Sequence, residues 1–121
     1  MNCVLLSGSL TRLPSTKFDP AGGTQTTTFT LAVSEANREG KPFTLFVGCV
    51  AFGRMAERCD VLQVGDVIEV CGKLTWQRRP ARCGEQHSVL VVGVKDLTVV
   101  HHGAPEAAND TQDRVSRPVG W

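Results

Sequence analysis

The chain has 121 residues, of which 41% are hydrophobic, which is enough for one domain with a buried core and too few for two. A net charge of +1 does not by itself indicate a nucleic-acid partner, but four basic residues and no acidic one lie between Lys73 and Arg82. The five cysteines have no C-x-x-C spacing, which argues against a disulfide framework or a zinc site. We find no leader-like segment and no long apolar run, so we expect no membrane contact and a reducing, cytosolic location.

The first part of the chain predicts two strands. Residues 2–10 form a β run in which Gly8 indicates a bulge or the close approach of another backbone. Residues 11–23 contain two prolines and a Gly-Gly pair, which predicts a loop or an irregular edge segment. Residues 24–34 alternate between apolar and polar side chains and predict a strand with one buried face. The polar residues 35–42 predict a projecting loop.

Residues 43–52 alternate, with Cys49 and Ala51 on one side and Phe46 and Phe52 on the other. Both sides are largely apolar, which predicts a central strand whose second face is either covered or used to stack flat ligands. Gly53 ends this strand, and residues 54–62 predict a short amphipathic helix.

The last part of the chain predicts two more strands. Residues 66–77 form one, with Leu74 on its buried face, and a second projecting loop covers 78–86. Residues 88–100 are so continuously apolar that we expect both faces to be covered. From Gly103 onward the chain is small and polar, and we expect a disordered tail.

Five β segments with one short helix between the third and the fourth match an all-β fold, the five-stranded Greek-key OB-fold barrel. Periodicity alone does not favour it over another small barrel. The predicted division is a barrel domain over residues 1–102 and a flexible C-terminal tail over 103–121.

The residues also resemble the bacterial single-stranded DNA-binding proteins, over residues 2–100. Each motif is mostly core and turn residues, but four occur in register. They are N-x-V-x-L-x-G-x-L from Asn2, Phe29-Thr30-Leu31-Ala32-Val33, Phe52-Gly53 with Ala56-Glu57, and Gly65-Asp66-x-Ile68-x-Val70-x-Gly72-x-Leu74.

The resemblance implies that Phe46 and Phe52 stack on nucleobases, because family members have aromatic stackers at these positions. The alternative is that both rings belong to the core or to an interface. Strict alternation buries Trp76, whereas strand twist or a bulge would bring it to the groove. Two further stackers of the family correspond to Asn37 and approximately Arg79 here, which suggests a weaker or shorter footprint.

Cations of two predicted loops are candidates for neutralising DNA phosphates. The alternative is that both loops are simply solvated. The candidates are Lys73, Arg78, Arg79 and Arg82 near the second loop, and Arg38 and Lys41 in the first.

The implied function is non-enzymatic: coating single-stranded DNA during replication, recombination and repair, as a homo-oligomer (dimer or tetramer) in the cytoplasm, associated with the nucleoid. We expect no cofactor, no metal and no catalytic site, because His87, His101 and His102 have no partner at a recognisable spacing. The alternative is a primosomal-type OB adaptor that acts mainly through protein contacts. The acidic tip with which related chains recruit replication and repair proteins is absent from the ending VSRPVGW, which puts such partners in doubt.

Overall fold

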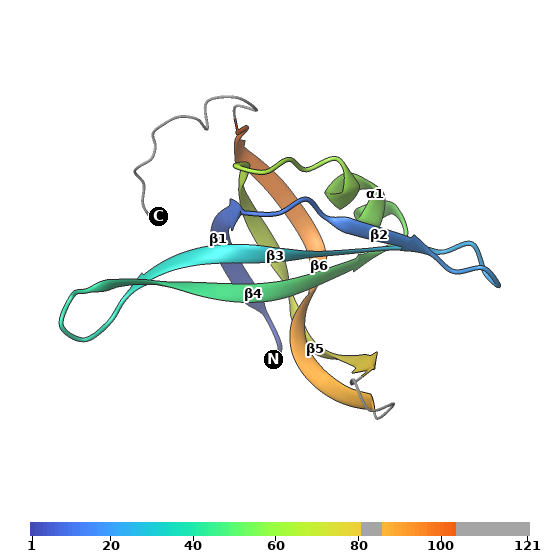
Figure 1. Cartoon of the computed structure of the whole chain (residues 1–121), viewed down its shortest axis with the longest axis horizontal. Helices are drawn as coiled ribbons and strands as arrows, with labels where there is room; N and C mark the ends of the chain where they lie inside the picture. Colours follow the sequence, from blue (N-terminus) through green and yellow to red (C-terminus); the bar gives the residue numbers. More distant parts are fainter. Residues whose placement is uncertain (81–85, 104–121) are drawn as a thin grey trace.

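The structure, a computed structural model, describes the backbone of residues 1–80 and 86–103 and the side chains of residues 1–78 and 88–103. This part of the chain contains six strands and one helix (Figure 1). They are β1 (Val4–Leu10), β2 (Ser15–Phe18), β3 (Gln25–Ala36), β4 (Pro42–Phe52), α1 (Arg54–Asp60), β5 (Val67–Pro80) and β6 (Gln86–His101). Every predicted strand and the predicted helix is therefore present, within a few residues of its expected bounds.

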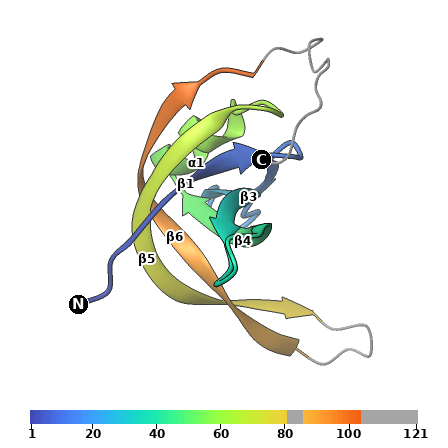
Figure 2. The same cartoon turned by 90° about the vertical axis from the view of Figure 1, so that its left-hand side faces the viewer.

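One sheet contains all six strands, in the order β1-β5-β6-β4-β3-β2. The end of β1 also pairs with β3, where Leu10 lies opposite Leu31, and this second pairing closes the sheet into a barrel. β4 and β6 run parallel where they meet, with Cys49 beside Val92. In Figure 2, β5 and β6 curve around the left of the barrel, while β3 and β4 lie to their right.

The barrel interior is filled by alternate side chains of the strands, as the period of two requires. Leu31 and Ile68 are fully buried, and Leu10, Val70 and Val92 are almost so. These residues come from four different strands, β1, β3, β5 and β6, so the core forms only when the barrel closes.

Helix α1 contributes to the same core. It follows Gly53, whose φ of 62° lies in the left-handed region that favours glycine. Ala56 and Cys59 are fully buried, and the buried hydroxyl of Thr27 donates a hydrogen bond to the Ala56 carbonyl at 3.0 Å. The helix therefore attaches to β3 and fixes the chain direction immediately after β4.

The opening motif has two structural roles. A Cβ atom at Gly8 would lie 2.4 Å from the carbonyl oxygen of Ala32, so the predicted close approach of another backbone is confirmed. Asn2 precedes β1, and its carboxamide accepts from the Leu74 amide and donates to the Leu74 carbonyl, both at 2.9 Å. This pair of bonds ties the start of the chain to β5.

The predicted loop over residues 11–23 contains a short edge strand, β2, which pairs antiparallel with β3. Thr16 faces inward, with its hydroxyl hydrogen-bonded to Thr27 and to the carboxylate of Asp60. Four mostly polar residues between prolines carry too little alternation to reveal a strand, so the pairing with β3 is the cause of this conformation.

The β5–β6 hairpin corrects two expectations about burial. Leu74 is 48% exposed rather than buried, because the hairpin projects beyond the barrel, where none of the described elements forms a second layer over it (Figure 1). For residues 88–100, both faces are covered at the centre, at Val91 and Val92, but the prediction is wrong toward the ends, at Leu90 and Val100.

The turn before β5 ends in a buried carboxylate. Asp66 accepts hydrogen bonds from the amides of Gln63 at 2.9 Å and Gly103 at 2.8 Å, which hold the end of β6 beside the turn. The predicted tail over 103–121 lies outside the described residues from 104 onward. Among the described elements α1, with seven residues, is the only helix, and none is long and apolar enough to cross a membrane.

Candidate nucleic-acid interface

Two phenylalanine rings project outward from β4. Phe46 is 65% exposed and Phe52 is 59% exposed, whereas Cys49 and Ala51, on the other side of the strand, are each 1% exposed. The predicted alternation is confirmed, and the alternative that both rings lie in the core of the barrel is wrong. Their stacking on bases stays a prediction.

The rings stand on a floor of small side chains. Phe52 lies opposite Thr26 on β3, and Phe46 lies opposite Ala32. Residues paired in register project from the same face of a sheet, so the outward side chains of β3 and β4 form one surface. We call it the aromatic face: Thr26, Thr28, Thr30, Ala32, Phe46 and Phe52. Val50 has the same parity as the two rings and lies between them on β4, but it is only 2% exposed.

Lys73 is the candidate cation that the sheet places beside this surface. It lies opposite Gly93 on β6, and Gly93 in turn lies beside Val50, the buried residue between the two rings of β4. Because Gly93 has no side chain, β6 places none between the exposed lysine and β4 at this level. The arrangement suits an ammonium group that binds a phosphate next to a stacked base.

Trp76 is 65% exposed, so the interpretation that buries it is wrong. It lies opposite Leu90, which is 56% exposed, on the projecting part of the β5–β6 hairpin. β5 keeps its alternation, since the register shifts are taken up by extra residues of β6. Trp76 therefore shares a side with Leu74 and projects from the side of the hairpin opposite to Lys73.

The structure does not bring the two predicted basic loops together. Arg38 and Lys41 lie exposed at the β3–β4 turn, where the Asn37 carboxamide accepts hydrogen bonds from the amides of Glu39 and Lys41, both at 2.9 Å. Figure 1 shows that the β3–β4 and β5–β6 hairpins project in different directions. The described parts of the two hairpins therefore do not converge on one groove.

Of the remaining predicted cations, Arg78 and Arg79 belong to β5 near its end. Arg78 is exposed. Arg79 belongs to β5 by its backbone, its side chain is not among those described, and Arg82 lies outside the described residues.

Arg12 and Lys17 are two exposed cations that the sequence pattern does not predict for this site. Arg12 lines a hollow of about 470 Å³ together with Thr11, Thr30 and Phe46. Lys17 lies on β2, opposite Thr26 of the aromatic face. Both lie within residues 11–23, which the sequence predicts to be a loop or an irregular edge segment. Only the pairing of β2 with β3 reveals their position.

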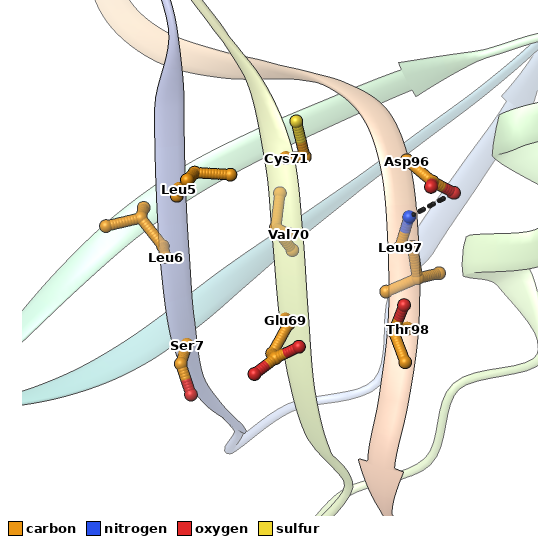
Figure 3. Close-up of a pocket in the computed structure, with 9 residues that line it drawn as sticks. All are labelled: Leu5, Leu6, Ser7, Glu69, Val70, Cys71, Asp96, Leu97 and Thr98. Carbon is orange, nitrogen blue, oxygen red and sulfur yellow. Dashed lines mark hydrogen bonds between the residues drawn. The ribbon is translucent and has the colours of Figure 1, made fainter.

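A second hollow, of about 340 Å³, lies on the outside of β1, β5 and β6 (Figure 3). Its outward residues differ from those of the aromatic face, because they include aliphatic and acidic side chains and no cation. We call this surface the acidic face: Leu5, Ser7, Glu69, Cys71, Asp96 and Thr98.

The carboxylate of Asp96 is held in its ionised form. The hydrogen bond from the Leu97 amide, at 2.8 Å, and then the Arg58 guanidinium, at 3.1 Å, lower the pKa of Asp96. The exposed carboxylate of Glu69 has no described ion pair and no described cation lines the hollow, so this surface suits a phosphate backbone less well than the aromatic face does.

The described residues offer no evident catalytic or metal centre. Burial, and then the neighbouring Cys59, raise the pKa of Cys49 to about 12, and burial raises the pKa of Cys59 to about 11, so both remain thiols. His101 and His102 are exposed at the end of β6. Within residues 1–80 and 86–103, no three His, Cys, Asp or Glu side chains gather in a way that would hold a metal ion.

Comparisons with known proteins agree with this geometry. Residues 1–100 match the model of the single-strand binding protein family. The single-stranded DNA-binding protein of Clostridium tetani is 31% identical over 110 residues, covering 89% of this chain and 76% of the relative. Single-stranded DNA-binding protein 3 of Clostridium acetobutylicum is 30% identical over 106 residues, covering 86% and 74%.

A crystal structure of a deletion mutant of the single-stranded DNA binding protein from Thermus aquaticus has a similar fold, with a TM-score of 0.67 and 26% identity. The match covers 84% of this chain but only 51% of that one, so the chain spans about half of its length. The predicted OB-fold is confirmed.

Proposed function

This chain belongs to the single-strand binding protein family, and from that membership we propose that it binds single-stranded DNA without strong sequence preference. The observation that carries the proposal is the pair of exposed rings, Phe46 and Phe52, on one strand of the barrel. Every base has a flat face, so stacking accepts any sequence and contributes about 1 to 3 kcal/mol per base.

The two rings hold separate bases of one strand of DNA. They are six residues apart on β4, which corresponds to about 20 Å at the usual rise of a β-strand. Lys73 neutralises a phosphate beside the aromatic face, and the cations of the two projecting hairpins, Arg38, Lys41, Arg78, Arg79 and Arg82, extend the contact outward. Trp76, on the other side of its hairpin, binds only a strand that passes around the hairpin edge.

Homo-oligomerisation follows from the acidic face. From Val4 to Gly8, β1 pairs with β5 on one edge, and no described strand pairs with its other edge over these residues. Leu5 is 73% exposed beside this open edge. An open edge with an exposed aliphatic side chain suits pairing with a second copy, as a dimer or a tetramer.

In the cell, such a protein coats and protects single strands during replication, recombination and repair, at the nucleoid in the cytoplasm. This role needs no catalytic group, and the aromatic face offers none.

Titration of labelled single-stranded and duplex oligonucleotides, followed by fluorescence anisotropy at several salt concentrations, tests the proposal. We expect clear preference for the single strand, with log K falling by about 0.7 per unit of log salt for each phosphate contacted. Equal affinity for both forms, or no binding of the single strand, would overturn it.

A further inference from the structure

The segment that leaves β1 runs beside the aromatic face. Thr11 and Arg12 follow β1 directly, and they line one hollow with Thr30 and Phe46. A guanidinium group and an exposed aromatic ring therefore border the same space. Thr11 and Thr30 add hydroxyl groups, which both donate and accept hydrogen bonds and so suit the edge of any base.

Lys17 has an equivalent place beside the second ring. It lies opposite Thr26, and Thr26 lies opposite Phe52, so the lysine and the ring project from one face with a single strand between them. Their backbones are about 10 Å apart, two strand spacings. Thr16 confirms the orientation, because it points the other way, to Thr27 and Asp60.

Neither cation is engaged within the protein. In the part of the chain that the structure describes, the only ion pair joins Arg58 to Asp96, and neither Arg12 nor Lys17 takes part in a described side-chain hydrogen bond. Asp19, the acid nearest to Lys17 along the chain, turns its carboxylate to the amide of Ala21 at 2.9 Å. Both charges are therefore available to an external anion.

We propose that Arg12 and Lys17 form a second line of phosphate contacts on the β2 side of the aromatic face, Arg12 serving the nucleotide stacked on Phe46 and Lys17 the nucleotide stacked on Phe52. The inference rests on the proposed function and makes it more specific. Lys73 holds the strand from the β5 side, so the DNA lies between two rows of cations with its bases on β4.

The salt dependence of binding tests this placement. Arg12→Gln and Lys17→Gln are compared with the parent on oligothymidylate of about 12 nucleotides, within the roughly 4 to 16 that one OB-fold covers. Each variant should lower the salt slope by about 0.7, the loss of one phosphate contact. Lys95→Gln is the matched control: Lys95 is exposed on β6 next to Asp96 of the acidic face, and its variant should keep the parent slope. Arg12→Lys should also keep it.

Double-mutant cycles test the pairing of each cation with one ring. Arg12→Gln should be non-additive with Phe46→Ala, by a factor of at least about two, and additive with Phe52→Ala. Lys17→Gln should show the reverse. Parent slopes in both Gln variants, or equal coupling for matched and crossed pairs, would overturn the inference. If the parent itself does not prefer single strands, the proposed function fails instead.

Discussion

The aromatic face and the acidic face are two outer surfaces of one barrel, and they differ in almost every chemical respect. The aromatic face offers two rings on a floor of threonines, with Lys73 and Lys17 beside it. The acidic face offers Leu5, two carboxylates and an ion pair to α1. Both surfaces belong to the same barrel, so the difference between them comes from the side chains that point outward from each strand.

From this difference we expect each surface to bind a different class of ligand. Phosphates favour a surface with cations and no acid, and bases favour exposed rings. The exposed carboxylate of Glu69, which has no described ion pair, disfavours phosphates, while an exposed leucine beside an open strand edge favours another protein chain. We therefore expect nucleic acid and a second copy to bind at the same time.

We expect the largest effect on binding from substitutions that remove both rings of the aromatic face and leave the acidic face unchanged. The double variant Phe46→Ala, Phe52→Ala should weaken binding of oligothymidylate by about 2 to 6 kcal/mol, the sum of two stacks, with an unchanged salt slope. Both rings are mostly exposed, so the melting temperature should change little. Phe18→Ala is the control, since Phe18 is 66% exposed but lies on β2 with the opposite parity to Lys17.

A folded double variant that binds like the parent would show that the rings do not stack. Equal weakening of binding by Phe18→Ala would show that the loss is not specific to the two rings of the aromatic face. Either result would contradict the proposal that the aromatic face binds the nucleic acid.

We expect the next largest effect, on the oligomeric mass, from a substitution in the acidic face that leaves the aromatic face unchanged. Leu5→Arg places a cation and a long side chain at the open edge of β1, where a second copy would pack. Light scattering at micromolar concentration should give at least a dimer for the parent and a smaller mass for the variant. Binding of a short oligonucleotide should persist, because Leu5 is not part of the aromatic face.

The oligomer interpretation fails if the parent is a monomer or if Leu5→Arg keeps the parent mass. Loss of short-oligonucleotide binding in a folded Leu5→Arg variant would instead show that the two surfaces are not independent.

Sequence patterns predict these surfaces where the signal is local. The alternation of residues 43–52 places Phe46 and Phe52 on one side and Cys49 on the other, and the motif glycine at position 8 indicates a close backbone approach; the structure confirms both. Each prediction needs only the period of a strand or the size of a glycine.

The failures concern contacts between distant segments. Leu74 has the right parity for burial, but burial also needs a second layer, which the projecting hairpin lacks. Lys17 joins the aromatic face only through the pairing of β2 with β3. Arg58 and Asp96 are 38 residues apart, and no local pattern connects them.

The smallest expected effect concerns the layer beneath the aromatic face, where Cys49 points into the core. Burial, with a smaller contribution from Cys59, raises its pKa from 9.0 to about 12. Above pH 9 the unfolded chain therefore loses this proton while the folded chain keeps it. The folded state binds more protons there, so the free energy of unfolding falls as pH rises through this window and is unaffected below it. At pH 10 the loss should be on the order of 1 kcal/mol for this thiol.

Urea unfolding at neutral pH and at pH 10 measures this loss, with Cys49→Ala as the comparison. The variant should be less stable than the parent at neutral pH because of the cavity it leaves. Its further loss of stability at pH 10 should be smaller than the parent's. An equal alkaline loss in both proteins would mean that this thiol ionises as readily in the folded chain as in the unfolded one, and that solvent reaches the barrel interior beneath the aromatic face.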